Sequence, residues 1–313
     1  MPNKNFLLGI VTMLVIGIVI QVFLQSTHKE PPPPIEVSAK TQESEQNTQS
    51  PKIESKVPSN ESTPANSNSS QMQMEFSTEI IEPLLNNPPA GDTPEIIQYT
   101  QAIKDNPYDA DAYLGRANAY ANLRNFDNAI ADYNVFIELY PYSAVGYNNR
   151  GNAYDSLKDY PKALSDFNQA LEINPNSAMT YSNRGNVYYN LGNYDQAISD
   201  HNKALELDPN YADAYNNRGN ALNKLKDYYK AISDFNRAIQ LNPNYAHAYN
   251  NRGVSYAGLH DYNLAISSFS KAIELNPNYA SAYNNRGLAY KESGQPQKAE
   301  EDFRRARQLG YNP

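Results

Sequence analysis

The chain has 313 residues, a formal net charge of −8, 26 tyrosines, no tryptophan and no cysteine. The absence of cysteine excludes disulfides, thiolate metal sites and lipid attachment through cysteine. The acidity is uneven, because residues 1–109 carry 6 Lys/Arg against 13 Asp/Glu (net −7), whereas residues 110–313 carry 20 against 21 (net −1). Such a balanced surface has no clustered basic face, which argues against nucleic acid as a partner.

The first predicted element is a membrane span. Residues 6–24 form a run of 19 whose clearly polar members are Thr12 and Gln21. As a helix this run covers roughly 28 Å, close to the ~30 Å hydrocarbon core of a bilayer. The alternative is a cleavable signal peptide, whose apolar region is shorter, about 7–15 residues, and ends in a small-x-small site that residues 22–25 lack. We therefore expect residues 1–24 to form an uncleaved single-pass anchor, with the membrane contacted through residues 6–24.

The charges around this span give its expected orientation. Lys4 and the amino terminus precede it, and His28, Lys29 and Glu30 follow it. Positive charge is retained on the cytoplasmic side of membranes. The slight excess before the span places the bulk of the chain outside the cytoplasm, on the periplasmic side of a bacterial membrane.

Residues 25–75 are predicted to be a disordered linker. They contain the run Pro31–Pro34 and then a stretch that consists mostly of Ser, Thr, Asn, Gln, Glu and Pro. Such a composition buries too little apolar surface to offset the entropy of ordering the chain. About 50 flexible residues reach roughly 40 Å, so we interpret the segment as a spacer in preference to a binding motif.

Residues 76–109 are predicted to hold an irregular segment and one helix. Pro83 interrupts the apolar residues that follow Phe76, and proline breaks helices from within. Thr93 and Pro94 then have the types favoured at an N-cap and at the first position of a helix. They predict a helix over residues 94–105.

The remaining chain is periodic. Six units of 34 residues align, and they cover 110–143, 144–177, 178–211, 212–245, 246–279 and 280–313. In every unit position 1 is Ala, position 4 is Tyr and position 20 is Ala, and position 8 is Gly in all but the first unit. Position 32 is Pro in the first five units. Coincidence at so many positions identifies a repeat architecture.

This period resembles the tetratricopeptide repeat, in which each unit is a pair of antiparallel helices with small residues where the helices cross and a proline after the second helix. The resemblance implies an all-α, right-handed superhelix, an α-solenoid of six helix-turn-helix units. The helix 94–105 is then a half-repeat that covers one end. The departures from the pattern are Ala117, Phe136 and His201, and none of them threatens the fold.

The last unit differs at the two positions expected to face a following unit. Positions 21 and 28 are Ile or Leu in the first five units but Glu300 and Arg307 in the sixth. We therefore expect the array to end with a charged cap.

Asparagine dominates one side of the first helix in each unit. At 100° per residue, positions 2, 5, 6, 9, 12 and 13 share one side. In the family this side lines the concave groove where partner peptides bind. The candidate groove residues at positions 5, 6 and 9 are Asn118, Asn148, Asn149, Asn152, Asn183, Asn186, Asn216, Asn217, Asn220, Asn250, Asn251, Asn284 and Asn285.

A row of asparagines on helices calls for an explanation, because asparagine is a poor helix former. A carboxamide both donates and accepts hydrogen bonds, so a stacked row can follow the backbone of an extended peptide whatever its side chains. A similar row lines the repeat arm of the O-linked N-acetylglucosamine transferase, where it holds substrate polypeptides. The alternative is that one neutral Asn-Asn-Arg-Gly block was copied as the repeats duplicated.

A second binding mode of the family, the carboxylate clamp of co-chaperones, fits poorly. Asn118 and Asn149 match two of its amide positions, but Leu114, Met179 and Asn183 occupy the places of its cations. A bound carboxylate would therefore lack its ion pairs.

Position 7 is arginine in all six units, and position 23 is aspartate in five of them. We interpret the two as an internal arginine–carboxylate ladder with a structural purpose. The arginines are Arg116, Arg150, Arg184, Arg218, Arg252 and Arg286, and the aspartates are Asp132, Asp166, Asp200, Asp234 and Asp302.

The sequence offers no catalytic or metal-binding constellation, and we expect no enzyme activity and no cofactor. The four histidines, His28, His201, His247 and His260, have no metal-ligand spacing, and no glycine-rich phosphate loop is present. The chain is therefore predicted to be a membrane-tethered scaffold that binds an extended protein or peptide partner in the groove. The alternative is an assembly module that self-associates, as a homo-oligomer, through its convex surface or its ends.

Overall fold

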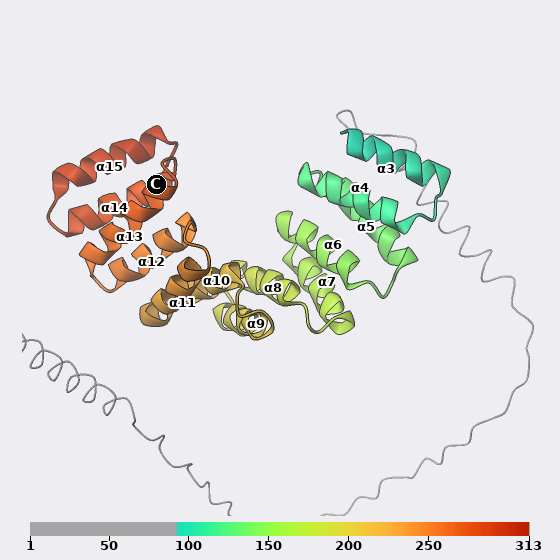
Figure 1. Ribbon diagram of the computed structural model, residues 1–313, viewed down its shortest axis with the longest axis horizontal. Helices are drawn as coiled ribbons and strands as arrows, with labels where there is room; N and C mark the ends of the chain where they lie inside the picture. The colour runs from blue at the N-terminus through green and yellow to red at the C-terminus, as the bar shows by residue number, and fades with distance from the viewer. Residues whose placement is uncertain (1–92, 313) are drawn as a thin grey trace, which may run out of the picture. The chain divides into compact units, whose positions relative to one another are not determined.

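The computed structural model describes residues 93–312, in which thirteen helices follow one another in a continuous row from α3 to α15 (Figure 1). The predicted anchor, the linker and the first part of the 76–109 segment lie outside the described residues. None of the thirteen helices is both long enough and apolar enough to cross a bilayer.

A single helix precedes six helix pairs, as predicted. This helix, α3, spans Pro94–Asp105, the range expected from its N-cap signal. The first helices of the pairs are α4 (Ala110–Asn122), α6 (Ala144–Ser156), α8 (Ala178–Asn190), α10 (Ala212–Lys224), α12 (Ala246–Gly258) and α14 (Ala280–Glu292). The second helices are α5 (Phe126–Leu139), α7 (Tyr160–Ile173), α9 (Tyr194–Leu207), α11 (Tyr228–Leu241), α13 (Tyr262–Leu275) and α15 (Pro296–Gln308). The prediction of an all-α solenoid is confirmed for this part of the chain.

The turn inside each pair uses one residue in the left-handed region, always at position 15. Glycine occupies it in two units, at Gly192 and Gly294, with φ of 80° and 76°. Four units use a residue with a side chain, Arg124, Lys158, Lys226 and His260, with φ between 60° and 62°. A β-carbon in this conformation costs roughly 1–2 kcal/mol, so the stacked helices hold these turns in place.

The helices of a pair cross where a glycine meets an aromatic ring. A β-carbon placed on Gly219 would lie 2.7 Å from the Phe235 ring, and one on Gly253 would lie 2.6 Å from Phe269. Position 8 must therefore be small wherever position 24 carries such a ring. In the first unit Ala117 takes the place of glycine, and the ring is that of Tyr133, whose hydroxyl donates to Asn118 Oδ1 at 2.7 Å.

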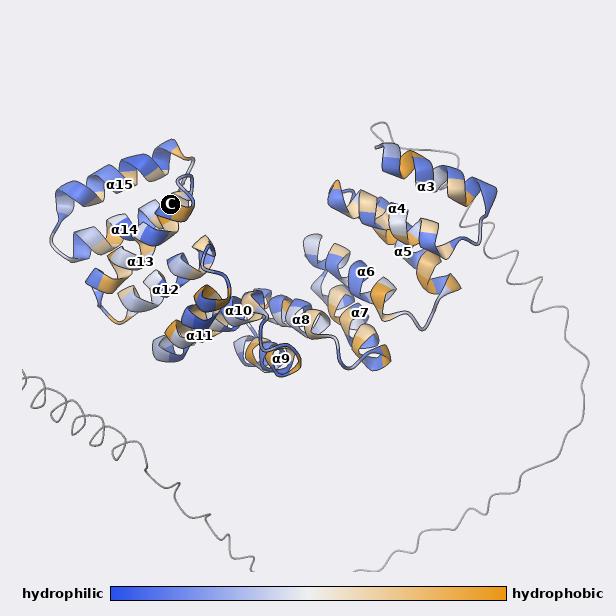
Figure 2. Cartoon of the chain, in the orientation of Figure 1, coloured by the Kyte–Doolittle hydropathy of each residue, from blue (hydrophilic) through white to orange (hydrophobic). Residues whose placement is uncertain are grey.

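Contacts between units show which helices line the inner side of the array. Each first helix contacts the first helix of the next unit, as in α8–α10 and α10–α12, whereas no two second helices of the described residues contact each other. The row therefore curves with its first helices on the concave side. Figure 2 shows that polar and apolar residues alternate along the helices, as expected where only part of each surface is covered.

The predicted arginine–carboxylate ladder is present. In units 2, 3, 4 and 6 the position-7 arginine donates through Nε and Nη2 to the position-23 aspartate at 2.6–2.8 Å. In units 2 to 5 its Nη1 also donates to Asn at position 25 of the preceding unit, as from Arg184 to Asn168 at 2.6 Å. The arginine thus joins the two helices of its own pair to the pair before it.

The first and fifth units depart from this pattern. Arg116 is fully enclosed and bonds both Asp132 and Thr100 of α3. In the fifth unit the carboxylate is replaced by Ser268, so Arg252 donates to Ser268 Oγ at 3.3 Å and to Asn236 at 2.8 Å.

The open face of the last pair is polar. Glu300 and Arg307 are exposed and bond each other at 2.9 Å, and α15 is almost entirely hydrophilic (Figure 2). The two charged residues predicted at positions 21 and 28 are therefore exposed to solvent.

His201 is a buried polar residue in an aromatic core position. It takes the place that phenylalanine has in units 2, 4, 5 and 6, is 0% exposed, and has no hydrogen-bond partner on either ring nitrogen. Burial, together with the smaller effect of the positive charge on Arg218, lowers its pKa to about 4. The ring is therefore held neutral in the folded state.

We expect His201→Phe to raise the free energy of unfolding by about 1–3 kcal/mol at pH 7, because it removes polar atoms that are buried without partners. The native chain should also lose stability, by roughly 3 kcal/mol in all, as the pH falls from about 6.5 toward 4. The reason is that His201 binds a proton in the unfolded state over this pH range but stays neutral in the folded state. Urea unfolding between pH 4 and 8 measures both effects. An equal acid sensitivity in the variant would contradict this assignment.

Candidate functional site

The candidate site is the concave surface of the first helices, where the predicted asparagines gather. Those at position 5 (Asn148, Asn216 and Asn250) are buried, with 4–6% of their surface exposed. The other candidates at positions 6 and 9 are half-buried, as is Asn284 in the last unit. The row is therefore layered, with position 5 beneath positions 6 and 9.

The carboxamides bond one another from unit to unit, an arrangement we call the carboxamide relay. Asn285 Nδ2 donates to Asn250 Oδ1 of the preceding unit at 3.0 Å, and Asn250 Nδ2 donates to Asn251 Oδ1 at 3.2 Å. Asn251 then donates to Asn216 at 3.0 Å, and Asn216 to Asn217 at 3.2 Å. Each amide in this series is oriented by its neighbours.

The relay runs along the array in two branches. The first continues from Asn217 to Asn186 at 3.0 Å and ends there. The second begins at Asn183, which donates to Asn148 at 3.2 Å, and passes through Asn149 to Asn118 at 3.1 Å for each step. The branches are separate because Ser182 occupies position 5 of the third unit, so no carboxamide there joins Asn217 to Asn183.

One rule explains which acceptor each position-6 amide uses. Where the preceding unit has asparagine at position 5, the bond goes to it, as from Asn183 to Asn148. Where position 5 is Leu114 or Ser182, the bond goes to the asparagine at position 9, as from Asn149 to Asn118. The relay thus gives the repeated asparagines a structural role that neither interpretation of the sequence included.

The relay leaves a defined set of groups for a ligand. Asn118 Oδ1 already accepts from both Asn149 and Tyr133. In contrast, the side chains of Asn152 and Asn220 form no hydrogen bond with any other described residue. Position-6 amides such as Asn183 and Asn217 use one of their two N–H groups in the relay. Positions 6 and 9 can therefore still bind a peptide backbone, whereas Asn148, Asn216 and Asn250 support the row from beneath and are too buried to touch a ligand.

Two hollows open along this surface. One, of about 420 Å³, lies over the first two units and is lined by Asn118, Asn149 and Asn152 together with Phe126 and Tyr133. The other, of about 320 Å³, lies over α6, α8 and α10 and is lined by Asp155, Asn186, Tyr189, Asn190, Asn217 and Asn220. Both hollows contain groups of the relay and also uncommitted carboxamides.

Three tyrosines at position 34 lie against groove residues of their own unit. The Tyr245 hydroxyl donates to Asp213 Oδ1 at 2.5 Å, and the Tyr279 hydroxyl bonds His247 Nδ1 at 2.8 Å. Tyr211 pairs in the same way with Ser182, and burial raises the pKa of Tyr211 and of Tyr279. Their repetition immediately before position 1 distinguishes these three from the tyrosines at position 4.

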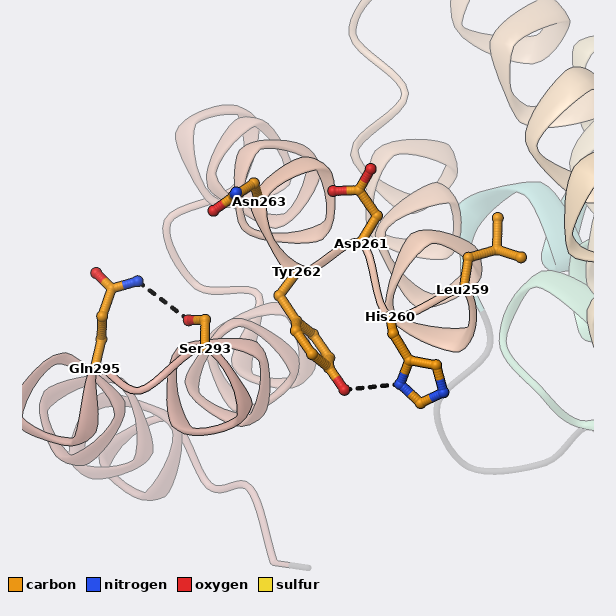
Figure 3. A pocket seen from close by; sticks show the side chains of 7 residues that line it. All are labelled: Leu259, His260, Asp261, Tyr262, Asn263, Ser293 and Gln295. Carbon is orange, nitrogen blue, oxygen red and sulfur yellow. Dashed lines mark hydrogen bonds between the residues drawn. The ribbon is translucent and has the colours of Figure 1, made fainter.

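A third hollow lies at the turns of the last two units, outside the groove (Figure 3). His260 Nδ1 and the Tyr262 hydroxyl bond each other at 2.9 Å there, and Gln295 donates to Ser293 at 3.1 Å. Its polar groups are largely satisfied among themselves, which makes it a weaker candidate site. The part of the chain that the structure describes contains no cluster of His, Asp and Glu able to hold a metal.

Comparison with known families identifies the class of protein. Tetratricopeptide repeat models match residues 144–177, 178–211, 212–245 and 246–279, and two further models of the same repeat match 98–144 and 268–301. The matches run continuously from 98 to 301, more than half of the chain, so the chain belongs to the tetratricopeptide repeat family. It is a non-catalytic scaffold for protein–protein interaction. No curated protein sequence matches it.

Solved structures to which this chain is similar include several repeat proteins. YrrB, described as a TPR protein with an unusual peptide-binding site, is 28% identical over 59% of this chain and 95% of its own, with a TM-score of 0.48. The Cut9–Hcn1 hetero-tetramer of the APC/C aligns at 18% identity over 77% of this chain and 50% of that one, with a TM-score of 0.63. PilF of Pseudomonas aeruginosa aligns at 18% over 64% and 91%, with a TM-score of 0.58. The last two likenesses support the fold alone.

We expect Asn250→Ala to lower the free energy of unfolding by about 1–3 kcal/mol, because Asn251 Oδ1 loses its donor and Asn285 Nδ2 loses its acceptor in a half-buried setting. Asn263→Ala is the matched control, since Asn263 is exposed on α13 and outside the relay. Its effect should be near zero or slightly stabilising, as alanine is the better helix former. Hydrogen exchange should show the loss concentrated in α12 and α14, and a loss of stability no larger than in the control would contradict a structural role for the relay.

Proposed function

We propose that this protein is a membrane-tethered scaffold that holds an extended segment of a partner polypeptide along the carboxamide row. The observation that carries the proposal is the relay, because it keeps amides at positions 6 and 9 in fixed orientations on the concave side. An amide held in place loses little entropy when it bonds a ligand, which favours binding. A peptide laid across the first helices would meet such amides once per unit.

The chemistry of the row favours backbone recognition. An extended peptide presents alternating N–H and C=O groups, and each uncommitted carboxamide matches either of them. No arginine or lysine lines the hollows over the first four units, whereas acceptors and donors from Asn149, Asn152, Asn217 and Asn220 do. These features fit a neutral main chain better than a terminal carboxylate or a phosphate.

The tether is the second part of the proposal. It rests on the apolar run at residues 6–24, on the polar spacer that follows and on the lysine that precedes the run. A tether of this kind would keep the groove near the outer surface of the cytoplasmic membrane, where the spacer lets it reach a partner. Full-length protein should accordingly sediment with membranes and require detergent for release.

The groove is tested with the full-length chain, solubilised in detergent and immobilised, against a displayed library of random 12-residue peptides. Peptides selected by the native chain should lose about thirty-fold in affinity for the Asn152→Ala/Asn220→Ala variant, because two hydrogen bonds of about 1 kcal/mol each disappear. These two side chains stand outside the relay, so stability should be unchanged. The control pair is Asn263→Ala/Gln297→Ala, on exposed surfaces of α13 and α15.

N-methylation of single peptide amides separates backbone from side-chain recognition. Methylation at alternate positions should weaken binding as strongly as the protein variant does. If no peptide is selected, or if selected peptides bind the double variant and the native chain equally, the groove proposal fails, and self-association through the convex surface or the ends becomes the better account.

A further inference from the structure

Asp155 is a carboxylate in the groove that has no cation beside it. Five other buried aspartates of the described residues, those at position 23, each face an arginine at 2.6–2.8 Å. Asp155 is half-buried, lies at position 12 near the end of α6, and forms no ion pair within the part of the chain that the structure describes. An acid in this position was not among the residues that the asparagine pattern singled out.

The surroundings of Asp155 disfavour its negative charge. Burial raises the pKa of this carboxyl, and a hydrogen bond from the Asn190 side chain offsets that rise only in part. Asp155 is also the penultimate residue of α6, where the helix dipole presents its negative end. A positive charge on a ligand would therefore stabilise the ionised form of this carboxyl.

The hollow above Asp155 has the lining that a cationic side chain needs. Asn217 and Asn220 of α10 lie across from it, and the Asn220 carboxamide is uncommitted. Tyr189 forms part of the wall, so an aromatic surface is available for an aliphatic stem or a planar guanidinium. The volume of about 320 Å³ is at the low end of the range of about 300–1,000 Å³ seen for ligand pockets, which suits one side chain.

We propose that the Asp155 hollow binds a positively charged side chain of the polypeptide held in the groove, with arginine preferred over lysine. The inference rests on the proposed function and adds a specificity element to it. Arginine is preferred because its guanidinium carries five donors in a fixed plane, and acceptors lie on more than one side of the hollow: the carboxylate of Asp155 and the carboxamide oxygen of Asn220.

The position of the hollow connects it to the carboxamide row. Asn217 both lines the hollow and belongs to the relay, and Asn220 is one of the uncommitted amides proposed to bind main chain. A peptide whose backbone lies on α10 can therefore direct one side chain toward α6. Such a peptide would be recognised through the side chain of one residue and bound elsewhere through its backbone, without sequence preference.

The test uses the same immobilised full-length chain and random peptide library. The native chain should enrich arginine, and to a smaller extent lysine, at one fixed position of the selected peptides. For a selected peptide, Asp155→Asn should lower affinity by about ten-fold, as expected when a close charge pair is removed. When that arginine of the peptide is changed to glutamine, the native chain and the variant should bind within about two-fold of each other.

The control is Asp195→Asn, which removes the same charge from an exposed position at the start of α9 and should leave affinity unchanged. Asp155→Asn keeps the shape of the side chain and removes a partly desolvated charge, so circular dichroism should show native folding. If peptides bind in a way that depends on Asn152 and Asn220 but show no cationic preference, or if Asp155→Asn retains that preference, this inference fails while the groove stands. If no peptide binds, both fail.

Discussion

The structure depends on contacts between neighbouring repeats. A helix pair encloses its own crossing point, where glycine at position 8 meets the ring at position 24, but its remaining apolar surface is covered only when the next pair stacks on it. Polar groups follow the same rule. The position-7 arginine reaches back to Asn at position 25 of the unit before, and the position-6 amide reaches back to position 5 or 9. The apolar burial and the hydrogen bonds of each unit are therefore completed by its neighbour.

These two polar series act on opposite sides of the first helix. The arginine series is largely buried and bidentate, which fixes the spacing of the helices. The carboxamide relay lies on the concave side and is half exposed, so the same bonds that join units also orient groups toward solvent. Stability and a preorganised binding surface thus come from one set of asparagines, which explains why a poor helix former recurs on regular helices.

The helices could be predicted from sequence because each signal depends on residues close together in the chain. The 34-residue period indicates a helix pair, the position-8 glycine marks where its helices cross, and the proline at position 32 follows the second helix. The arginine–aspartate pairs were also predictable, since positions 7 and 23 recur together. The relay was not, because its acceptors depend on whether the preceding unit has Asn or a residue such as Ser182 at position 5. Burial of Asn148, Asn216 and Asn250 follows from the same stacking, and the significance of Asp155 appears only when α6, α8 and α10 are brought side by side.

Photo-crosslinking tests the central claim most directly, namely that the carboxamide row is the surface that holds a polypeptide. A library-selected peptide with a diazirine residue at each position in turn would be bound to the full-length chain, irradiated and mapped by mass spectrometry. The account predicts crosslinks on successive first helices, in particular α6, α8 and α10, in an order that follows the peptide sequence. Crosslinks confined to the second helices α7, α9 and α11, or to the ends of the array, would contradict it.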